Sequence, residues 1–157
     1  MSELDAADRA YRAGPEAAGE VARLLHDFNT EFDTETPGAV TLARRLTSML
    51  AGPSTIAYLI RDPAVGVALL TLRTNVWYDG PVALLDELYV APPHRGHGLG
   101  SAIIHRVLMD AIKIGVSAIE INVDQADVDA QRFYERHGFS GKDPDTGERA
   151  FYYALEL

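Results

Sequence analysis

The feature that most constrains this chain is a glycine-rich stretch between a strand-like run and an amphipathic helix. In "VAPPHRGHGLGSA", residues 90–102, glycine stands at every second position, at Gly96, Gly98 and Gly100. The apolar run before it, residues 83–90, is typical of a strand. Apolar pairs then recur every four residues up to Gly115, as on a helix that ends at a glycine. With a further strand expected at 117–123, the unit predicts two parallel neighbouring strands joined by a helical crossover.

The position of these glycines favours an anion as their ligand. The first N–H groups of a helix have no partner within it and carry partial positive charge. Glycines let the backbone curl toward a phosphate, and Arg95 adds a permanent charge beside them. Two nucleotide motifs are excluded at Ser101, because a P-loop needs lysine there and a dinucleotide fingerprint needs glycine. A tight strand-to-helix turn without a ligand is the alternative interpretation.

The other elements follow from apolar periodicity and from turn residues. Helices are predicted at residues 15–29, 38–50 and 127–137, and strands at residues 8–13, 55–61, 65–73, from Phe139 onward and over 150–157. Short turns join the three central strands, which indicates an antiparallel meander. We therefore expect one α/β domain of the mixed α+β type, residues 1–157, with about four helices around a central, mostly antiparallel sheet of about seven strands.

Composition excludes several classes of protein. The chain has 157 residues, 47% of them apolar, which suits one domain with a real core. It has no cysteine, which excludes disulfides and thiolate metal sites, and its formal net charge of −9 makes it a poor general binder of nucleic acid. No apolar run approaches the roughly 20 residues of a membrane span, and the acidic N-terminus is unlike a secretory signal. We expect a cytoplasmic protein without nucleic-acid or membrane partners, whose acidity either favours cationic ligands or only keeps it soluble.

Two motifs together resemble the GNAT superfamily of N-acetyltransferases. "ELYVAPPHRGHGLGSAII" is similar to that family's strand, acyl-CoA pyrophosphate loop and helix, and "AQRFYERHGF", residues 130–139, is similar to its downstream signature. The motif similarity covers about residues 84–139, and the expected order of elements matches along nearly the whole chain. The resemblance implies an acetyl-CoA-dependent N-acetyltransferase with a GNAT-like fold, in which the two parallel strands splay apart.

The resemblance implies where acetyl-CoA would bind. The strand before the loop would offer its backbone to the pantetheine arm at Leu88, Tyr89 and Val90. The loop that would hold the pyrophosphate comprises Arg95, Gly96, His97, Gly98, Leu99, Gly100 and Ser101. His94 and His97 have no third ligand nearby in sequence, so we expect no metal.

The downstream signature departs from the family pattern at one position. Many members carry an asparagine there that bonds the pantetheine arm, whereas this chain has Asp127. An ionised aspartate accepts hydrogen bonds but cannot donate them, and Asp127 could instead cap the helix that begins at residue 128. Arg132 or Arg136 would reach the terminal phosphate of CoA, or would lie in solvent as ordinary helix charges.

The implied reaction is direct attack of an amine on the thioester, without an acyl-enzyme. Deprotonating an alkyl amine of pKa about 10.4 at pH 7 takes roughly 4.6 kcal/mol, whereas a thiol leaving group of pKa about 8.5 needs only about 2 kcal/mol. By its place in the motif, Tyr134 would donate a proton to the departing thiolate, unless it is only a packed aromatic. By its alignment with a base of some family members, Asp86 is the first candidate base, followed by Glu120, which aligns with a base in other members, and by Glu87, the neighbour of Asp86; a water relay is the alternative. Strand alternation puts Asp86 and Glu87 on opposite faces unless a bulge intervenes.

The resemblance implies that the acceptor amine lies opposite the CoA arm, beside the loop after the first helix and a turn between strands. The loop carries Glu31, Phe32, Asp33 and Glu35, and the turn carries Trp77, Tyr78 and Asp79. Carboxylates beside an aromatic face suit an ammonium group. We therefore expect a cationic small-molecule amine such as a polyamine or an amino sugar, with a solvated acidic loop as the alternative.

Two other functions remain open at this point. One is a protein N-terminal or lysine acetyltransferase, which a flat acceptor cleft would favour. The other is a non-catalytic acyl-CoA-binding regulatory domain. Family members often form homodimers through their C-terminal strands, and the apolar segment "AFYYALEL", residues 150–157, is the candidate for such contacts here, if it is not an ordinary internal strand.

Overall fold

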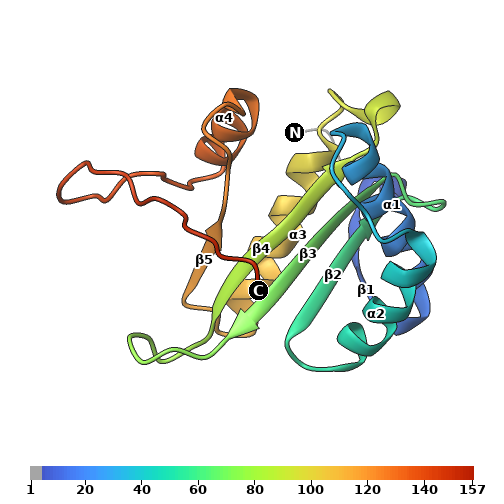
Figure 1. The fold of residues 1–157 in the computed structure, drawn as a ribbon, viewed down its shortest axis with the longest axis horizontal. Helices are drawn as coiled ribbons and strands as arrows, with labels where there is room; N and C mark the ends of the chain where they lie inside the picture. Colours follow the sequence, from blue (N-terminus) through green and yellow to red (C-terminus); the bar gives the residue numbers. More distant parts are fainter. Residues whose placement is uncertain (1–4) are drawn as a thin grey trace. The chain divides into compact units, whose positions relative to one another are not determined.

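The computed structural model describes residues 5–157 and has the mixed α/β architecture that the sequence predicts (Figure 1). In this range there are four α-helices and one five-stranded sheet. The elements are β1 (Ala10–Ala13), α1 (Ala18–Glu31), α2 (Ala39–Ala51), β2 (Thr55–Ile60), β3 (Gly66–Arg73), β4 (Val82–Val90), α3 (Leu99–Lys113), β5 (Ala118–Ile121) and α4 (Val128–Arg136).

The sheet combines the expected meander with the expected crossover. Its strand order is β1-β2-β3-β4-β5, and all neighbours are antiparallel except the parallel pair β4–β5. β4 is nine residues long, but only Val82–Leu85 pair with β5, opposite Ala118–Ile121. Beyond Leu85, the outer edge of β4 has no strand partner among the described residues.

Helices cover both faces of the sheet (Figure 1). Because side chains alternate along a strand, Leu59, Val67 and Leu69 point to one face, where they form a buried cluster with α1 and α2. α3 lies on the opposite face, and its Ile103 and Val107 are fully buried there. The sheet is therefore a middle layer packed on both faces, and this packing positions β4 and the start of α3.

A partly buried chain of polar side chains ties α3 to the sheet. Tyr58 of β2 is 2% exposed, and its hydroxyl donates to Asp110 Oδ2 at 3.1 Å. Burial first, and the Asp110 carboxylate second, raise the pKa of Tyr58 to about 12. Arg106 donates to the same carboxylate oxygen at 2.9 Å and to the carbonyl of Ala10 at 3.1 Å. The chain links three elements that are far apart in sequence.

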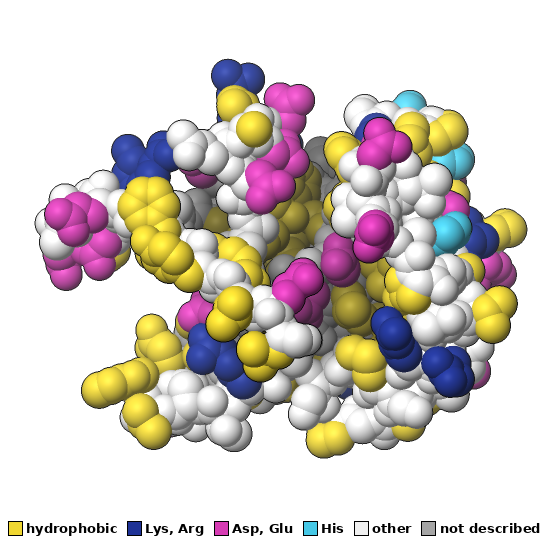
Figure 2. Space-filling model, viewed as in Figure 1, with side chains coloured by type: hydrophobic (Ala, Val, Ile, Leu, Met, Phe, Trp, Pro, Cys, Tyr) yellow, Lys and Arg dark blue, Asp and Glu magenta, His cyan; other side chains and the backbone are white. Residues whose placement is uncertain are grey.

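The two C-terminal strands predicted from the sequence are absent, so the sheet has five strands rather than about seven. Residues 139–157 contain no strand, although "AFYYALEL" is rich in the apolar and aromatic residues that favour strands. A strand forms only against a neighbouring edge, and this segment has no strand partner among the described residues. Its side chains are instead exposed, at 76% for Phe151, 89% for Tyr153 and 85% for Leu155. Figure 2 shows hydrophobic side chains gathered on the surface over this segment.

The chain divides into two compact units. The first ends at Ile121 and holds the sheet with α1, α2 and α3. The second, Asn122–Leu157, holds α4 and the C-terminal segment. Across residues 5–157, no helix is long and apolar enough to cross a membrane. That the whole chain is one domain remains a prediction.

Candidate active site

The glycine-rich loop leads from β4 into α3. A 3-10 turn at Pro92–His94 follows the strand, and Gly98 takes the N-cap position of α3 with a φ of 80°. Gly96 has a φ of 77°, so both glycines are in the left-handed region that other residues rarely adopt. A Cβ at either position would meet nothing within 4 Å. Backbone conformation, rather than crowding, therefore explains why these two positions are glycine.

The first turn of α3 has the properties of an anion site. Gly98 caps the helix without a side-chain hydrogen bond, so no cap occupies the N–H groups of that turn. Residues 95–98 are exposed, while Leu99 beneath them is buried. Exposed N–H groups at the positive end of a helix dipole favour a phosphate oxygen.

Arg95 binds Glu31, the last residue of α1, instead of standing as a free charge. Its Nη1 and Nη2 donate to the two carboxylate oxygens of Glu31 at 2.9 and 2.8 Å, and its Nε donates to the carbonyl of Val90 at 2.8 Å. The guanidinium also lies over the ring of Tyr89, 5.5 Å from its centroid. The structure thus joins Arg95, which was predicted to bind the pyrophosphate, to Glu31, which was predicted to bind the acceptor amine.

Tyr89 anchors this ion pair to the sheet. Its ring stacks on Phe28 of α1 with centroids 4.9 Å apart, and its hydroxyl donates to Glu31 Oε1 at 3.3 Å. Burial, followed by the Glu31 charge, raises the pKa of Tyr89. The Tyr89 side chain is therefore a packing residue beneath the ion pair, whereas the resemblance implied only its backbone.

A β-bulge lies at the candidate bases of β4. Leu69 pairs with Glu87 and Leu70 pairs with Leu85, so Asp86 has no opposite residue on β3. A bulge suspends the normal alternation of side chains. Glu87 is opposite Leu69, which faces α1 and α2, and Asp86 Oδ2 accepts a 2.5 Å hydrogen bond from Thr71, two residues further along that face. Both carboxylates therefore face the same side of the sheet.

Glu87 is the less exposed of the two carboxylates. Burial raises its pKa above the ordinary value, and the neighbouring Asp86 charge raises it further. Among the described residues, no hydrogen-bond donor is paired with its carboxylate, and no unpartnered side-chain oxygen is sealed from solvent. Glu87 is therefore a partly buried carboxylate whose oxygens are still accessible.

Glu120 is held by an ion pair on β5. It lies opposite Leu84 in the parallel register, and its carboxylate accepts from Arg73 Nη2 at 2.8 Å. Both side chains are about half exposed. An ion pair already occupies this carboxylate, which makes it the weaker candidate for a base.

The second unit contains the candidate acid. Tyr134 is on α4, and its ring packs edge-on against Phe133 and Phe139, with centroids 5.2 and 5.6 Å away. Asp127 is the N-cap of this helix and accepts from the N–H of Ala130 at 3.0 Å. This is the capping role that the sequence offered as the alternative to a contact with pantetheine. Arg136 lies over the Phe133 ring.

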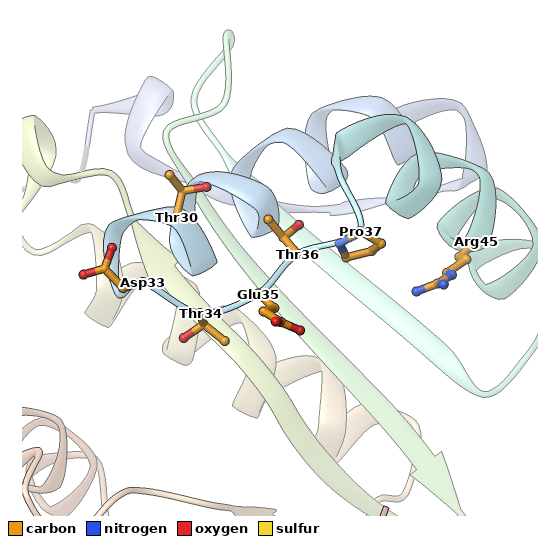
Figure 3. Close-up of a pocket in the computed structure, with 7 residues that line it drawn as sticks. All are labelled: Thr30, Asp33, Thr34, Glu35, Thr36, Pro37 and Arg45. Atoms are coloured by element: carbon orange, nitrogen blue, oxygen red, sulfur yellow. The ribbon is translucent and has the colours of Figure 1, made fainter. Parts of the chain in front are cut away.

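The acceptor-side residues are divided between two surfaces of the first unit. Asp33 and Glu35, in the loop between α1 and α2, line an open hollow of about 820 Å³ (Figure 3). The other residues that line it are Thr30, Thr34, Thr36, Pro37 and Arg45. Phe32 is exposed and packs edge-on against Phe28. Trp77 and Tyr78 do not line the hollow; they are exposed on a turn in which Asn75 Oδ1 accepts from both of their backbone N–H groups.

Two residues near the site carry no motif that would single them out in the sequence. Thr71 bonds Asp86, 15 residues away. Arg61, with a φ of 66°, pairs with Asp8 and lies 3.3 Å from His94 Nδ1, which braces the start of the glycine loop. Only tertiary structure brings such partners together. In the part of the chain that is described, no three metal-ligating side chains are grouped.

Known acetyltransferases are similar to this chain in sequence and in fold. The acetyltransferase (GNAT) family matches residues 20–139. A crystal structure of a candidate acetyltransferase from Arthrobacter sp. FB24 is 47% identical, covers 99% of this chain and 100% of that chain, and has a TM-score of 0.91. An uncharacterized N-acetyltransferase of Mycobacterium tuberculosis is 38% identical over 55 residues, so the match spans 35% of each protein.

A more distant structure shares the fold alone. An aminoglycoside N-acetyltransferase in complex with CoA is 16% identical, covers 94% of this chain and 99% of that chain, and has a TM-score of 0.69. The family match includes the strand, the glycine loop, α3 and the start of the second unit. The chain therefore belongs to the GNAT family of acetyltransferases.

Proposed function

We propose that this chain transfers the acetyl group of acetyl-CoA to a primary amine by direct attack. The observation that carries the proposal is one strand–loop–helix unit with two open features: the outer edge of β4 beyond Leu85 and the uncapped first turn of α3. The edge offers backbone groups to the amides of the pantetheine arm, and the turn suits the pyrophosphate. The CoA complex of the aminoglycoside enzyme supports acetyl-CoA as the co-substrate.

Glu87 is the proposed general base. A base for an alkyl ammonium group works best when its own pKa is raised toward neutrality, and burial raises that of Glu87. Asp86 and Glu120 already bind Thr71 and Arg73. This assignment differs from the sequence-based preference for Asp86, and it rests on the bulge, which brings Glu87 to the same face as Asp86.

Tyr134 is the proposed acid that protonates the departing thiolate. The support is its position in the "RFYERHGF" signature of the family match. A tyrosine hydroxyl of pKa about 10 is protonated at pH 7 and can donate to a thiolate.

The proposed acceptor is a small cationic amine. The loop after α1 presents Asp33 and Glu35 beside the exposed ring of Phe32, and the chain carries a net charge of −9. Carboxylates and an aromatic face attract ammonium groups. An aminoglycoside, the acceptor in the name of one structural neighbour, is an amine of this kind.

A calorimetric titration followed by a thiol-release assay tests the function. The protein is titrated with acetyl-CoA and CoA, and the variant Arg95→Glu/Gly98→Asp is the control. We expect micromolar binding that the control loses. Turnover is then measured with polyamines, amino sugars, lysine peptides and N-terminal peptides. Failure of a folded protein to bind either nucleotide would overturn the proposal.

The acceptor panel separates this proposal from its alternatives. Thiol release with the small cationic amines is the expected result. Release with peptides alone would identify a protein acetyltransferase instead. Tight binding of acetyl-CoA without release by any acceptor would identify a regulatory domain.

We also propose that the protein is a cytoplasmic homodimer. The observation that supports a dimer is the group of exposed apolar side chains in residues 150–157. An exposed apolar patch of this kind commonly marks a protein interface.

A further inference from the structure

The contact between Arg95 and Glu31 joins the two sides of the proposed reaction. Arg95 directly precedes Gly96, so it begins the loop proposed for the pyrophosphate. Glu31 directly precedes Phe32, so it ends α1 where the proposed acceptor loop begins. The cation suited to one ligand and the anion suited to the other are therefore bound to each other, although 64 residues separate them.

The geometry of the pair matches that of an Arg–phosphate contact. Arg95 donates two parallel hydrogen bonds to the two oxygens of Glu31, and an arginine fork binds phosphate oxygens in the same way. The Glu31 carboxylate thus occupies the guanidinium face that a phosphate would otherwise use.

Exposure makes an exchange of partners feasible. The Arg95 side chain is 43% exposed and that of Glu31 is 26% exposed. Ion pairs in contact with water are weak, because water and salt compete for both charges. The pyrophosphate of CoA carries a negative charge on each of its phosphates, more in total than the single charge of a carboxylate, so it can displace Glu31 at a small cost in free energy.

Tyr89 keeps Glu31 in place when the arginine leaves. Its hydroxyl donates to Glu31 Oε1, and stacking on Phe28 fixes its ring against α1. Glu31 would thus retain one hydrogen-bond donor and stay beside the acceptor loop as an unneutralised carboxylate.

We propose that Arg95 exchanges the Glu31 carboxylate for the pyrophosphate of acetyl-CoA, and that the released Glu31 then binds the ammonium group of the acceptor. This inference rests on the proposed function and adds a link between its two sites. Each ligand strengthens the binding of the other, since coupling between two sites is reciprocal. Glu31 is the residue through which this coupling acts.

Calorimetry of CoA binding to charge variants tests the exchange. Glu31→Gln removes the competitor of the phosphate, so CoA should bind about two- to fivefold tighter than to the unaltered protein, the range expected for breaking an exposed ion pair. Arg95→Gln should weaken binding. Asp27→Asn is the matched control, because it removes the same charge from α1 one turn earlier, at a residue paired with Arg23 rather than Arg95.

A double variant separates the exchange from a general effect of charge. In the Arg95→Gln background, Glu31→Gln should give no gain in CoA affinity, because the competing pair is already gone. In steady-state assays, Glu31→Gln should lower the KM for acetyl-CoA and raise the KM for the amine. Thermal unfolding of each variant confirms that it is folded.

The outcomes separate this inference from the function on which it rests. If the unaltered protein binds CoA and releases thiol, but Glu31→Gln binds CoA no tighter than Asp27→Asn does, the exchange is wrong and the function stands. A gain that persists in the Arg95→Gln background, or an unchanged KM for the amine, also overturns the exchange. If the unaltered protein does not bind CoA, both proposals fail.

Discussion

The carboxyl group of Glu87 should set the acid limb of the pH–rate profile. The active form of a base is deprotonated. The value of kcat/KM should therefore rise as the pH passes upward through the raised pKa of Glu87, and it should fall below that pKa. Glu87→Gln should remove this limb and lower kcat by about 100-fold or more. The measurement is kcat/KM for the acceptor between pH 5 and pH 9.

Variants of the two rival carboxylates provide the comparison. Asp86→Asn and Glu120→Gln should both retain the acid limb, because neither removes the titrating group. A limb that disappears with Asp86→Asn and persists with Glu87→Gln would return the role of base to Asp86.

The sequence identified these residues and placed Asp86 first, whereas the present proposal places Glu87 first. The change of order depends on a bulge that appears only in the pairing of β3 with β4. The same limit applies to Arg95 and Glu31. Each was assigned to a ligand from its local context, and nothing local indicates that they bind each other across 64 residues.

The glycine loop depends on the backbone conformation of its glycines, so a substitution that disturbs this conformation should impair the loop. Gly98→Ala places a side chain at a φ of 80° and should destabilise the protein by about 1–2 kcal/mol. It should also weaken CoA binding about tenfold or more if α3 starts in a different conformation. Chemical unfolding and calorimetry measure the two effects.

Gly115 at the other end of α3 supplies the matched control. It has the same φ of 80°, and a Cβ there also meets nothing within 4 Å. Gly115→Ala should therefore cost similar stability without changing CoA affinity. Equal losses of affinity in both variants would mean that the loop has no special role in binding.

The tie between β2 and α3 should weaken in alkaline solution. The pKa of Tyr58 is about 12 in the folded chain, above the ordinary value of about 10 that applies on unfolding. The folded state therefore holds this proton more tightly. The contribution of this proton to the free energy of unfolding is fully present below pH 10. It is lost as the pH rises toward 12, and the total loss is on the order of 2 kcal/mol.

Tyr58→Phe isolates this effect. The variant should be about 1 kcal/mol less stable at pH 8, because a buried hydrogen bond to Asp110 is lost. The difference between the two proteins in the free energy of unfolding, measured with urea, should then become smaller between pH 10 and pH 11. A gap that stays constant would show that the hydroxyl does not titrate in this range.

Most elements were predictable because their periodicity is strong. α1, α2, α3 and the three meander strands lie within a few residues of their expected positions, since helical and alternating spacing are local properties. The prediction of two C-terminal strands was wrong because a strand also depends on a partner that is distant in the sequence. "AFYYALEL" has the apolar and aromatic composition of a strand, but composition cannot indicate whether a partner edge is present.

The C-terminal segment, residues 150–157, should determine whether the protein forms a homodimer. Light scattering should give twice the 17.1 kDa of one chain, and Tyr153→Asp/Leu155→Asp should give a monomer, because charges disrupt an apolar interface. Each copy carries a net charge of −9, so the dimer should also tighten as salt screens their repulsion. A monomer at micromolar concentration in physiological salt would contradict this prediction.

The mismatch in length between β4 and β5 has a consequence for hydrogen exchange. The amides of β4 that pair with β3 should be protected, whereas those on its outer edge between residues 86 and 89 have no strand partner among the described residues. They should exchange with deuterium as fast as loop amides, although they belong to a central strand. A pantetheine arm bound along this edge would slow them selectively, so these few amides would report directly whether the acetyl donor is bound.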